Sequence, residues 1–153
     1  MGAMTPWLEP DEQRTWRAYL TASRALMETL DRELQRDAGM PHAYYEILVR
    51  LSEAPRRRLR MSELAEASGS SRSRLSHAVA RLEAAGWVRR EECPTDRRGQ
   101  IAVLTDEGFA TLAAAAPGHV EGVRRHLFDA LSPAQADQLR RISETIAEHL
   151  TGS

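Results

Sequence analysis

One stretch of the chain gathers side chains that can donate hydrogen bonds to a nucleic acid. Between residues 71 and 82 an apolar stripe of Leu75, Val79 and Leu82 has the four- and three-residue spacing of a helix. The opposite face carries donors and no acidic residue: Arg72, Ser73, Arg74, Ser76, His77 and Arg81. Arginine can donate two hydrogen bonds to guanine O6 and N7, whereas serine and histidine are less selective. The pattern therefore predicts a helix that contacts base edges and phosphates of DNA.

Within this helix, the early exposed positions are expected to contact bases, and the later Arg81 is expected to contact a phosphate. The predicted base-contacting residues are Ser71, Arg72, Ser73, Arg74, Ser76 and His77. For each serine the alternative is a capping role or simple solvent exposure. For Ser70 and Ser71, capping is at least as good an interpretation as base contact.

A shorter helix is predicted to precede this one and to hold it in place. Ser62 is a candidate N-cap for the first helix, and Gly69 is a candidate end. Ser70 or Ser71 can cap the second helix, and Gly86 ends it as a C′ glycine would. Two helices joined by a short turn with a glycine, the second presenting donors, form the helix-turn-helix pattern.

A β-hairpin is predicted directly after the second helix. Residues 87–92 and 101–105 are the expected strands, and residues 59–61 are expected to add a third. The loop 93–100 is rich in turn residues and holds Asp96, Arg97 and Arg98. A basic hairpin in this position is a wing, which lays an arginine into the minor groove or along the backbone. The alternative is a turn stabilised by the aspartate, with its arginines in solvent.

Charge is distributed unevenly along the chain. All 21 basic residues are arginines, and the formal net charge is −1. The segment from Arg50 to Arg98 holds 12 arginines and 7 acidic residues, whereas the rest of the chain holds 9 arginines and 15 acidic residues. A positive segment on an acidic body is typical of a protein that binds DNA, although charge runs also occur on ordinary solvated surfaces.

Length and composition limit the other possibilities. With 153 residues, of which 42% are hydrophobic, the chain is expected to form one domain with a real core. A single cysteine excludes an internal disulfide and fits a reducing cytoplasm. No apolar run approaches the length of a membrane span, and the N-terminus lacks the pattern of a signal peptide. We therefore expect a cytoplasmic protein with no membrane partner.

Apolar stripes at the two ends of the chain have no predicted sheet to cover them. Helices are expected from about residue 9 to 37, from residue 105 onward with a kink or break at Pro117-Gly118, and from residue 131 to 150. The last helix has a complete start signal, with Ser132 as N-cap, a proline at the first helical position and Gln135 three residues after the cap. Packing against one another, together with the same helices of a second chain, would bury these stripes. The predicted fold is mainly α with a small β wing. It has a winged helix-turn-helix lobe at 41–104 and dimerisation helices at 9–37 and 105–150, within one domain spanning 9–150.

Four segments make the chain resemble the MarR family of bacterial winged-helix regulators, over nearly its whole length from about Glu9 to Leu150. They are Leu64-Ala65 through Arg81-Leu82-Glu83, Gly86-Trp87-Val88-Arg89-Arg90, Asp96-Arg97-Arg98, and Leu104-Thr105-Asp106-Glu107-Gly108. The part from helix to wing is the specific part of the match, and the flanking helices are compatible with it.

The resemblance implies roles for particular residues. Asp96-Arg97-Arg98 resembles the family's Asp-x-Arg wing motif, in which the arginine enters the minor groove and the aspartate helps to hold it. Carried over, Arg98 is the groove residue, Asp96 orients it and Arg97 contacts the backbone. The resemblance also implies that the terminal helices form a homodimer, which places two recognition helices about one DNA turn apart on an inverted repeat.

A small-molecule effector is also implied. Members of the family bind aromatic acids or other phenolic compounds in a cleft between the dimer helices and the DNA-binding lobe. The candidates to line such a cleft are Trp16, Tyr19, His42, Tyr44 and Tyr45, with Arg14 or Arg17 pairing a carboxylate. Core packing explains the aromatic residues equally well.

Catalysis has no support in the pattern of residues, so no enzyme activity, cofactor or metal site is predicted. The five histidines lack metal-ligand spacing, and there is neither a phosphate-binding glycine loop nor a nucleophile elbow. Cys93 is expected to be a plain residue, because redox-sensing members of the family carry their reactive cysteine near the N-terminus. The alternative is a redox switch, which would need an exposed thiol whose pKa is lowered by the nearby Arg89 and Arg90.

The sequence thus predicts a sequence-specific transcription regulator that binds double-stranded DNA at a pseudo-palindromic operator as a homodimer. Repression, with release by the small ligand, is the family's commoner mode. Two alternatives keep the fold: a ligand-independent or nucleoid-type DNA-binding protein, and a winged-helix module that binds proteins.

Overall fold

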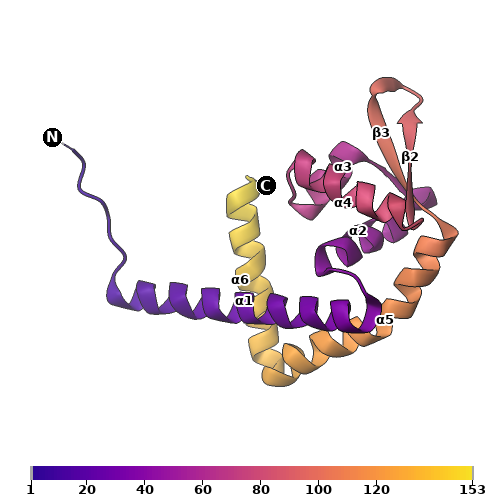
Figure 1. The fold of residues 1–153 in the computed structure, drawn as a ribbon. Coiled ribbons are helices and arrows are strands. Elements are labelled where there is room, and N and C mark those ends of the chain that lie inside the picture. The colour runs from indigo at the N-terminus through magenta and orange to yellow at the C-terminus, as the bar shows by residue number, and fades with distance from the viewer. Residues whose placement is uncertain (1, 153) are drawn as a thin grey trace. The chain divides into compact units, whose positions relative to one another are not determined.

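The computed structural model describes residues 2–152, without the side chains of Arg97 and Arg98. Six helices, two 3-10 turns and three strands follow one another along these residues (Figure 1). In chain order they are α1 (Pro10–Ala38), α2 (His42–Glu53), η1 (Pro55–Arg57), β1 (Arg58–Arg60), α3 (Met61–Ser68), α4 (Arg72–Ala84), β2 (Val88–Cys93), β3 (Asp96–Leu104), α5 (Asp106–His126), η2 (Phe128–Ala130) and α6 (Pro133–Thr151). The predicted fold class, mainly α with a small β wing, is confirmed.

The chain divides into two compact units. Unit 1 comprises Met1–Leu30 and Gly122–Ser153, and unit 2 comprises Asp31–Glu121. Unit 2 holds α2, α3, α4 and the sheet, together with the end of α1 and most of α5. No helix in the described part of the chain is long and apolar enough to cross a membrane.

The sheet of unit 2 is antiparallel, in the order β1-β3-β2. The predicted third strand is confirmed, since Arg58 pairs with Val103 and Arg60 pairs with Ile101. The hairpin β2-β3 projects beyond the helices of this unit (Figure 1). Its second strand begins earlier than predicted, because β3 already starts at Asp96. The segment 96–100 is therefore strand, and the prediction of a loop there was wrong.

The core of unit 2 is formed where the helices meet the sheet. The apolar stripe predicted for α4 is buried, with Leu75, Val79 and Leu82 each at most 2% exposed. They join apolar side chains of α2, α3 and the strands, including Leu48, Leu51, Leu64, Val88 and Ala102. Burying a large aliphatic side chain contributes about 1.5–3 kcal/mol, so this cluster fixes α4 against the sheet.

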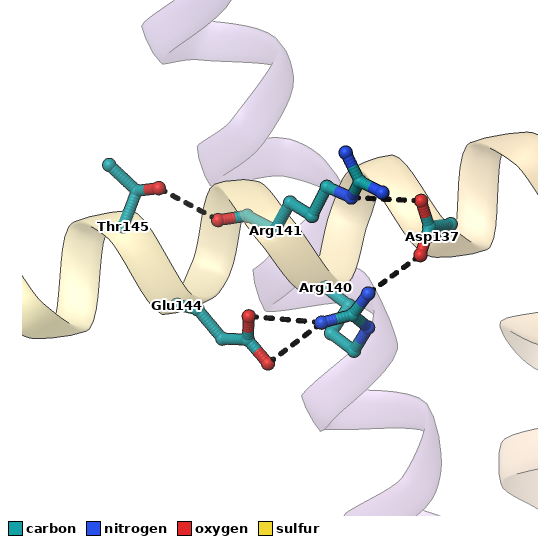
Figure 2. Close-up of polar contacts among 5 residues, drawn as sticks. All are labelled: Asp137, Arg140, Arg141, Glu144 and Thr145. Carbon is teal, nitrogen blue, oxygen red and sulfur yellow. Dashed lines mark hydrogen bonds and ion pairs between the residues drawn. The ribbon is translucent and has the colours of Figure 1, made fainter.

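Helix α6 in unit 1 begins as predicted. Ser132 accepts a hydrogen bond from the Gln135 backbone, and the Gln135 side chain accepts one from the Ser132 backbone, which is a complete capping box. Figure 2 shows an ion-pair ladder farther along this helix: Arg140 contacts Asp137 and Glu144, and Arg141 contacts Asp137. None of the residues of α6 is buried within the single chain.

Two predicted helix ends differ from the structure. Ser62 does not cap α3, because the helix begins at Met61 with Arg60 in the N-cap position. Pro117 does not break α5, which continues to His126. Pro117 is exposed, and the helix loses only one backbone hydrogen bond there, while Leu112 on the same helix is buried in the core. The ends predicted at Gly69 and Gly86 are confirmed, both with positive φ.

Candidate nucleic-acid interface

Helix α4 is held in place at both ends by local hydrogen bonds. Ser71 is its N-cap, and the Ser71 hydroxyl accepts from the Arg74 backbone N–H at 3.2 Å. At the other end the Trp87 N–H donates to the Leu82 carbonyl and the Gly86 N–H donates to the Glu83 carbonyl, which is a Schellman motif. Ser71 therefore has the capping role that was the alternative to base contact, and the donor side chains from Arg72 onward take no part in either cap.

The predicted donor residues all lie on the exposed side of this helix: Ser71, Arg72, Ser73, Arg74, Ser76, His77 and Arg81. Within the described part of the chain, Arg72, Arg74 and Arg81 make no ion pair. Several other arginines of unit 2 do: Arg90 contacts Glu83 at 3.4 Å, and Arg58 and Arg89 contact Glu91 at 3.5 and 3.0 Å. Glu83 and Glu91 are thus paired with arginines of the sheet, whereas the α4 guanidiniums have no ion-pair partner among the described residues.

The structure brings the start of α4 and the wing together. A cleft of about 390 Å³ lies between them and is lined by Arg60, Met61, Ser62, Arg72, Leu75, Ser76, Asp96, Gly99 and Gln100. Predicted residues from both elements, Arg72 and Ser76 of α4 and Asp96 of β3, share this cleft. A shallower hollow follows the exposed face of α4 along Arg72, Ser73, Ser76, His77 and Ala80.

The wing strand is irregular at the predicted arginines. Glu92 pairs with Gln100 and the next residue, Cys93, pairs with Asp96, so residues 97–99 lie between two consecutive rungs of the ladder. A bulge of this kind bends a strand and redirects its side chains. The backbones of Arg97 and Arg98 belong to β3, but their side chains lie outside the described parts of the structure. Their predicted roles therefore remain predictions.

Two contacts fasten the turn of the wing. Arg60, at the end of β1, donates to the Thr95 hydroxyl at 3.0 Å, and Cys93 Sγ lies 3.3 Å from the same oxygen. The hydrogen bond with Thr95 is the main cause of a lowered pKa of Cys93, whose side chain is buried. The contact between Arg60 and Thr95 was not predicted, because it joins residues 35 positions apart in the sequence.

Aromatic rings predicted to bind a ligand fall in different units. In unit 1, Trp16 and Tyr19 lie one helical turn apart with ring centroids separated by 6.3 Å. In unit 2, the rings of Tyr45 and His42 both contact the ring of His119, with ring centroids 4.5 and 5.4 Å from the His119 centroid. Of the two candidate arginines on α1, Arg14 contacts Asp11 at 3.6 Å, and Arg17 is exposed.

The His119 ring is partly buried, and its Nδ1 atom has no hydrogen-bond partner in the described structure. Burial is the main cause of a lowered pKa of His119. The neighbouring His42 lowers it further, and Glu33 opposes the change. Burial also raises the pKa of Tyr45. The lowered pKa of His119 favours the neutral form of its imidazole.

Tyr44 lies in a different environment from Tyr45. It lines an open cleft of about 490 Å³ between α2 and α4, together with Ala43, Glu46, Ile47, Ser68, Ser70, Ser73, Arg74, Leu75, His77 and Ala78. Three of the predicted DNA-contacting residues, Ser73, Arg74 and His77, therefore also border this cleft.

Among the described residues, no group of three or more His, Cys, Asp or Glu side chains is arranged to hold a metal ion.

Other contacts at the base of the wing were not predicted. The guanidinium of Arg57 lies 3.8 Å from the centre of the Phe109 ring, and Arg56 and Arg57 both have positive φ. Thr105, which the sequence marks only as a helix start, bonds to the turn that ends α4. The motif Leu104-Thr105-Asp106-Glu107-Gly108 was the available signal, but its spacing alone does not reveal the partner.

Comparison with known proteins agrees with this architecture. Residues 38–99 match the model of the MarR family. The Escherichia coli (strain K12) transcriptional repressor MprA is 30% identical over 125 residues, which cover 82% of this chain and 70% of MprA.

Two solved structures from Streptomyces coelicolor are more similar in sequence. Sco3205, a MarR family transcriptional regulator solved in complex with DNA, is 58% identical and has a TM-score of 0.92, with 95% of this chain and 92% of Sco3205 covered. AbsC, another MarR family transcriptional regulator, is 48% identical with a TM-score of 0.90, covering 97% of this chain and 100% of AbsC. The chain belongs to the MarR family of transcriptional regulators.

Proposed function

We propose that this protein is a homodimeric repressor that binds an inverted-repeat DNA operator and leaves it when a small aromatic or phenolic ligand binds. Helix α4 enters the major groove and the wing reaches the adjacent minor groove. The observation that carries this proposal is the donor face of α4. Its arginines Arg72, Arg74 and Arg81 are exposed and form no ion pair with a described carboxylate, and Arg72 shares a cleft with the wing.

The chemistry of this face suits DNA. Arg72 and Arg74 lie in the first turn of α4, the part of a recognition helix that contacts base edges. Each bidentate contact of an arginine with guanine contributes about 1–3 kcal/mol of discrimination between bases. Arg81 lies farther along the helix, where it meets a phosphate. The structure of the relative Sco3205 in complex with DNA supports the same use of the fold here.

Association of two chains follows from the apolar face of α6. Leu139, Ile142 and Ile146 are spaced three and four residues apart, and they are 38%, 56% and 43% exposed. Such a stripe opposite an ion-pair ladder needs a partner to cover it. We assign a second copy, because two recognition helices are needed to occupy both half-sites of an inverted repeat.

Repression and release by a ligand complete the proposal. The relative MprA is named a transcriptional repressor, which supports this direction of control. The proposed ligand-contacting residues of unit 2 are His42, Tyr44 and Tyr45. Trp16 and Tyr19, in unit 1, stay a prediction from the sequence. A ligand that prefers the conformation unable to bind DNA shifts the population toward that state by its difference in affinity.

The test begins with selection of binding sites from a random duplex library by the full-length protein. We expect an inverted repeat, and fluorescence anisotropy should show much tighter binding to it than to a scrambled duplex at two salt concentrations. Equal binding to both duplexes, collapsing with added salt, indicates a nonspecific DNA-binding protein. No binding to any duplex overturns the proposal and favours the protein-binding module.

Variants locate the contacts. Arg72→Ala and Arg74→Ala should each weaken binding to the selected repeat about 5- to 150-fold. Arg98→Ala should weaken it substantially while the dimer stays intact. Arg24→Ala removes the same charge from the exposed surface of α1 and serves as the matched control. Unchanged affinity in the Arg98 variant overturns the wing assignment alone.

A thermal-shift series with salicylate and related aromatic acids tests the ligand, since binding to the folded state raises Tm with concentration.

A further inference from the structure

The end of α4 and the start of α5 are joined by a compact set of hydrogen bonds. The Thr105 hydroxyl donates to the Gly86 carbonyl at 2.7 Å and accepts from the Gly108 backbone N–H at 3.0 Å. The Thr105 backbone N–H donates to the Trp87 carbonyl at 3.0 Å. We call these four residues, Gly86, Trp87, Thr105 and Gly108, the Thr105 joint.

Close packing reinforces these hydrogen bonds. A Cβ atom added at Gly108 would overlap the Trp87 carbonyl oxygen and would lie 2.8 Å from Leu104 Cδ1. The first turn of α5 therefore rests directly on the backbone that leaves α4, with no side chain between them. Such contact leaves little room for α5 to rotate against this backbone.

The same residues also end the recognition helix. Gly86 and Trp87 supply the N–H groups of the Schellman motif that closes α4, and their carbonyls accept from Thr105. One short piece of backbone is thus bonded to α4 on one side and to the cap of α5 on the other. A change in the angle between α4 and the first turn of α5 requires that some of these bonds break.

We propose that Thr105 and Gly108 are positioning residues that set the half-site spacing to which the protein binds. The inference rests on the proposed function, a dimer on an inverted repeat. The residues of α5 from 106 to 121 lie in unit 2, and the helix then continues into unit 1, to which the dimer surface is assigned. A rotation at the Thr105 joint therefore changes the orientation of α4 relative to α5, the helix that continues into the unit assigned to the dimer surface.

A small rotation is enough to matter. Residues 106–121 span about 22 Å at about 1.5 Å per residue. A rotation of about 9° at one end displaces the other by about 3.4 Å, the rise of one base pair. A firm joint therefore discriminates between operators whose half-sites differ in spacing by a single base pair, whereas a loose joint does not.

The experiment compares Thr105→Val, which removes both hydroxyl bonds at nearly constant volume, with Thr105→Ser, which keeps them. Thr111→Val is the matched control, because Thr111 lies on the same helix and, among the described residues, its hydroxyl donates only to the Glu107 carbonyl of that helix. Each protein is titrated with the inverted repeat selected by the wild type, with the same repeat lengthened or shortened by one base pair, and with a single half-site.

We expect wild type, Thr105→Ser and Thr111→Val to lose about tenfold in affinity when the spacing changes, and Thr105→Val to lose only about threefold or less. Single half-site affinity should stay the same in all four. If Thr105→Val does not fold, as judged by circular dichroism, Thr105→Ala replaces it, since it adds no bulk beside Gly86. An unchanged spacing penalty in the variant that lacks the hydroxyl overturns this inference alone. A wild type that selects no inverted repeat overturns the proposed function instead, and this inference with it.

Discussion

Two glycines on α5 are expected to respond in opposite ways to the same substitution. At Gly108 the added Cβ overlaps the backbone of Trp87, which cannot rotate away as a side chain would. At Gly118 the added Cβ meets no atom within 4 Å. Overpacking costs about 1–3 kcal/mol, and a rigid partner places Gly108→Ala at the upper end. Replacing a helical glycine by alanine returns about 1 kcal/mol. The expected net loss is about 2 kcal/mol for Gly108→Ala, against a gain of about 1 kcal/mol for Gly118→Ala.

Thermal unfolding followed by circular dichroism measures both changes. For a chain of this length about 1 kcal/mol moves Tm by about 2–4 °C, so we expect Gly108→Ala to lower Tm by about 4–8 °C and Gly118→Ala to raise it by about 2–4 °C. Protein concentration must be equal in every scan, since dimer formation makes Tm depend on it. A Gly108→Ala protein as stable as wild type would refute the close approach of α5 to Trp87.

Three further perturbations test other parts of the structure. Ile142→Glu should convert the dimer to monomer in analytical ultracentrifugation, because it places a charge in the exposed apolar face of α6, whereas Thr145→Glu on the ion-pair face should not. A dimer that survives the first change places the association surface elsewhere. Because His119 has a lowered pKa when folded, the free energy of unfolding should be steady above pH 6.5 and fall as the pH drops through the folded pKa. His119→Phe should flatten that part of the profile, and an equally steep profile would assign the effect to other groups. Ser71→Ala should cost about 1 kcal/mol in urea unfolding through loss of the α4 cap, and Ser70→Ala, as its control, should cost less. Equal losses in both serine variants would contradict the cap assignment.

Features encoded within a few neighbouring residues could be predicted from the sequence. The capping box at Ser132, the glycine ends at Gly69 and Gly86, and the buried stripe of α4 all depend on contacts within one or two helical turns. The donor face of α4 follows from the same periodicity, because burying Leu75, Val79 and Leu82 forces the intervening side chains outward.

Features that depend on distant partners could not be predicted. The segment 96–100 contains a glycine and turn-forming residues, yet it is strand, because β2 pairs with Asp96 and Gln100 at its two ends, a long-range pairing that local propensity does not encode. Pro117 stays within a helix, because packing elsewhere along α5 outweighs one lost hydrogen bond. The contacts of Arg60 with Thr95 and of Thr105 with Gly86 join positions 35 and 19 residues apart. The residues that position the donor face of α4 are therefore harder to predict than the exposure of the face itself.

The net charge of a sequence segment does not show which of its arginines are paired with carboxylates in the fold. The segment from Arg50 to Arg98 exceeds neutrality by only five arginines, yet its acidic residues are not spread evenly over the fold. Glu83 and Glu91 are engaged by Arg90, Arg58 and Arg89 of the sheet. Those arginines form ion pairs with neighbouring carboxylates, whereas the guanidiniums of α4 form none among the described residues. The charges of Arg72, Arg74 and Arg81 are consequently left without an ion pair among the described residues, on the helix that we propose contacts DNA.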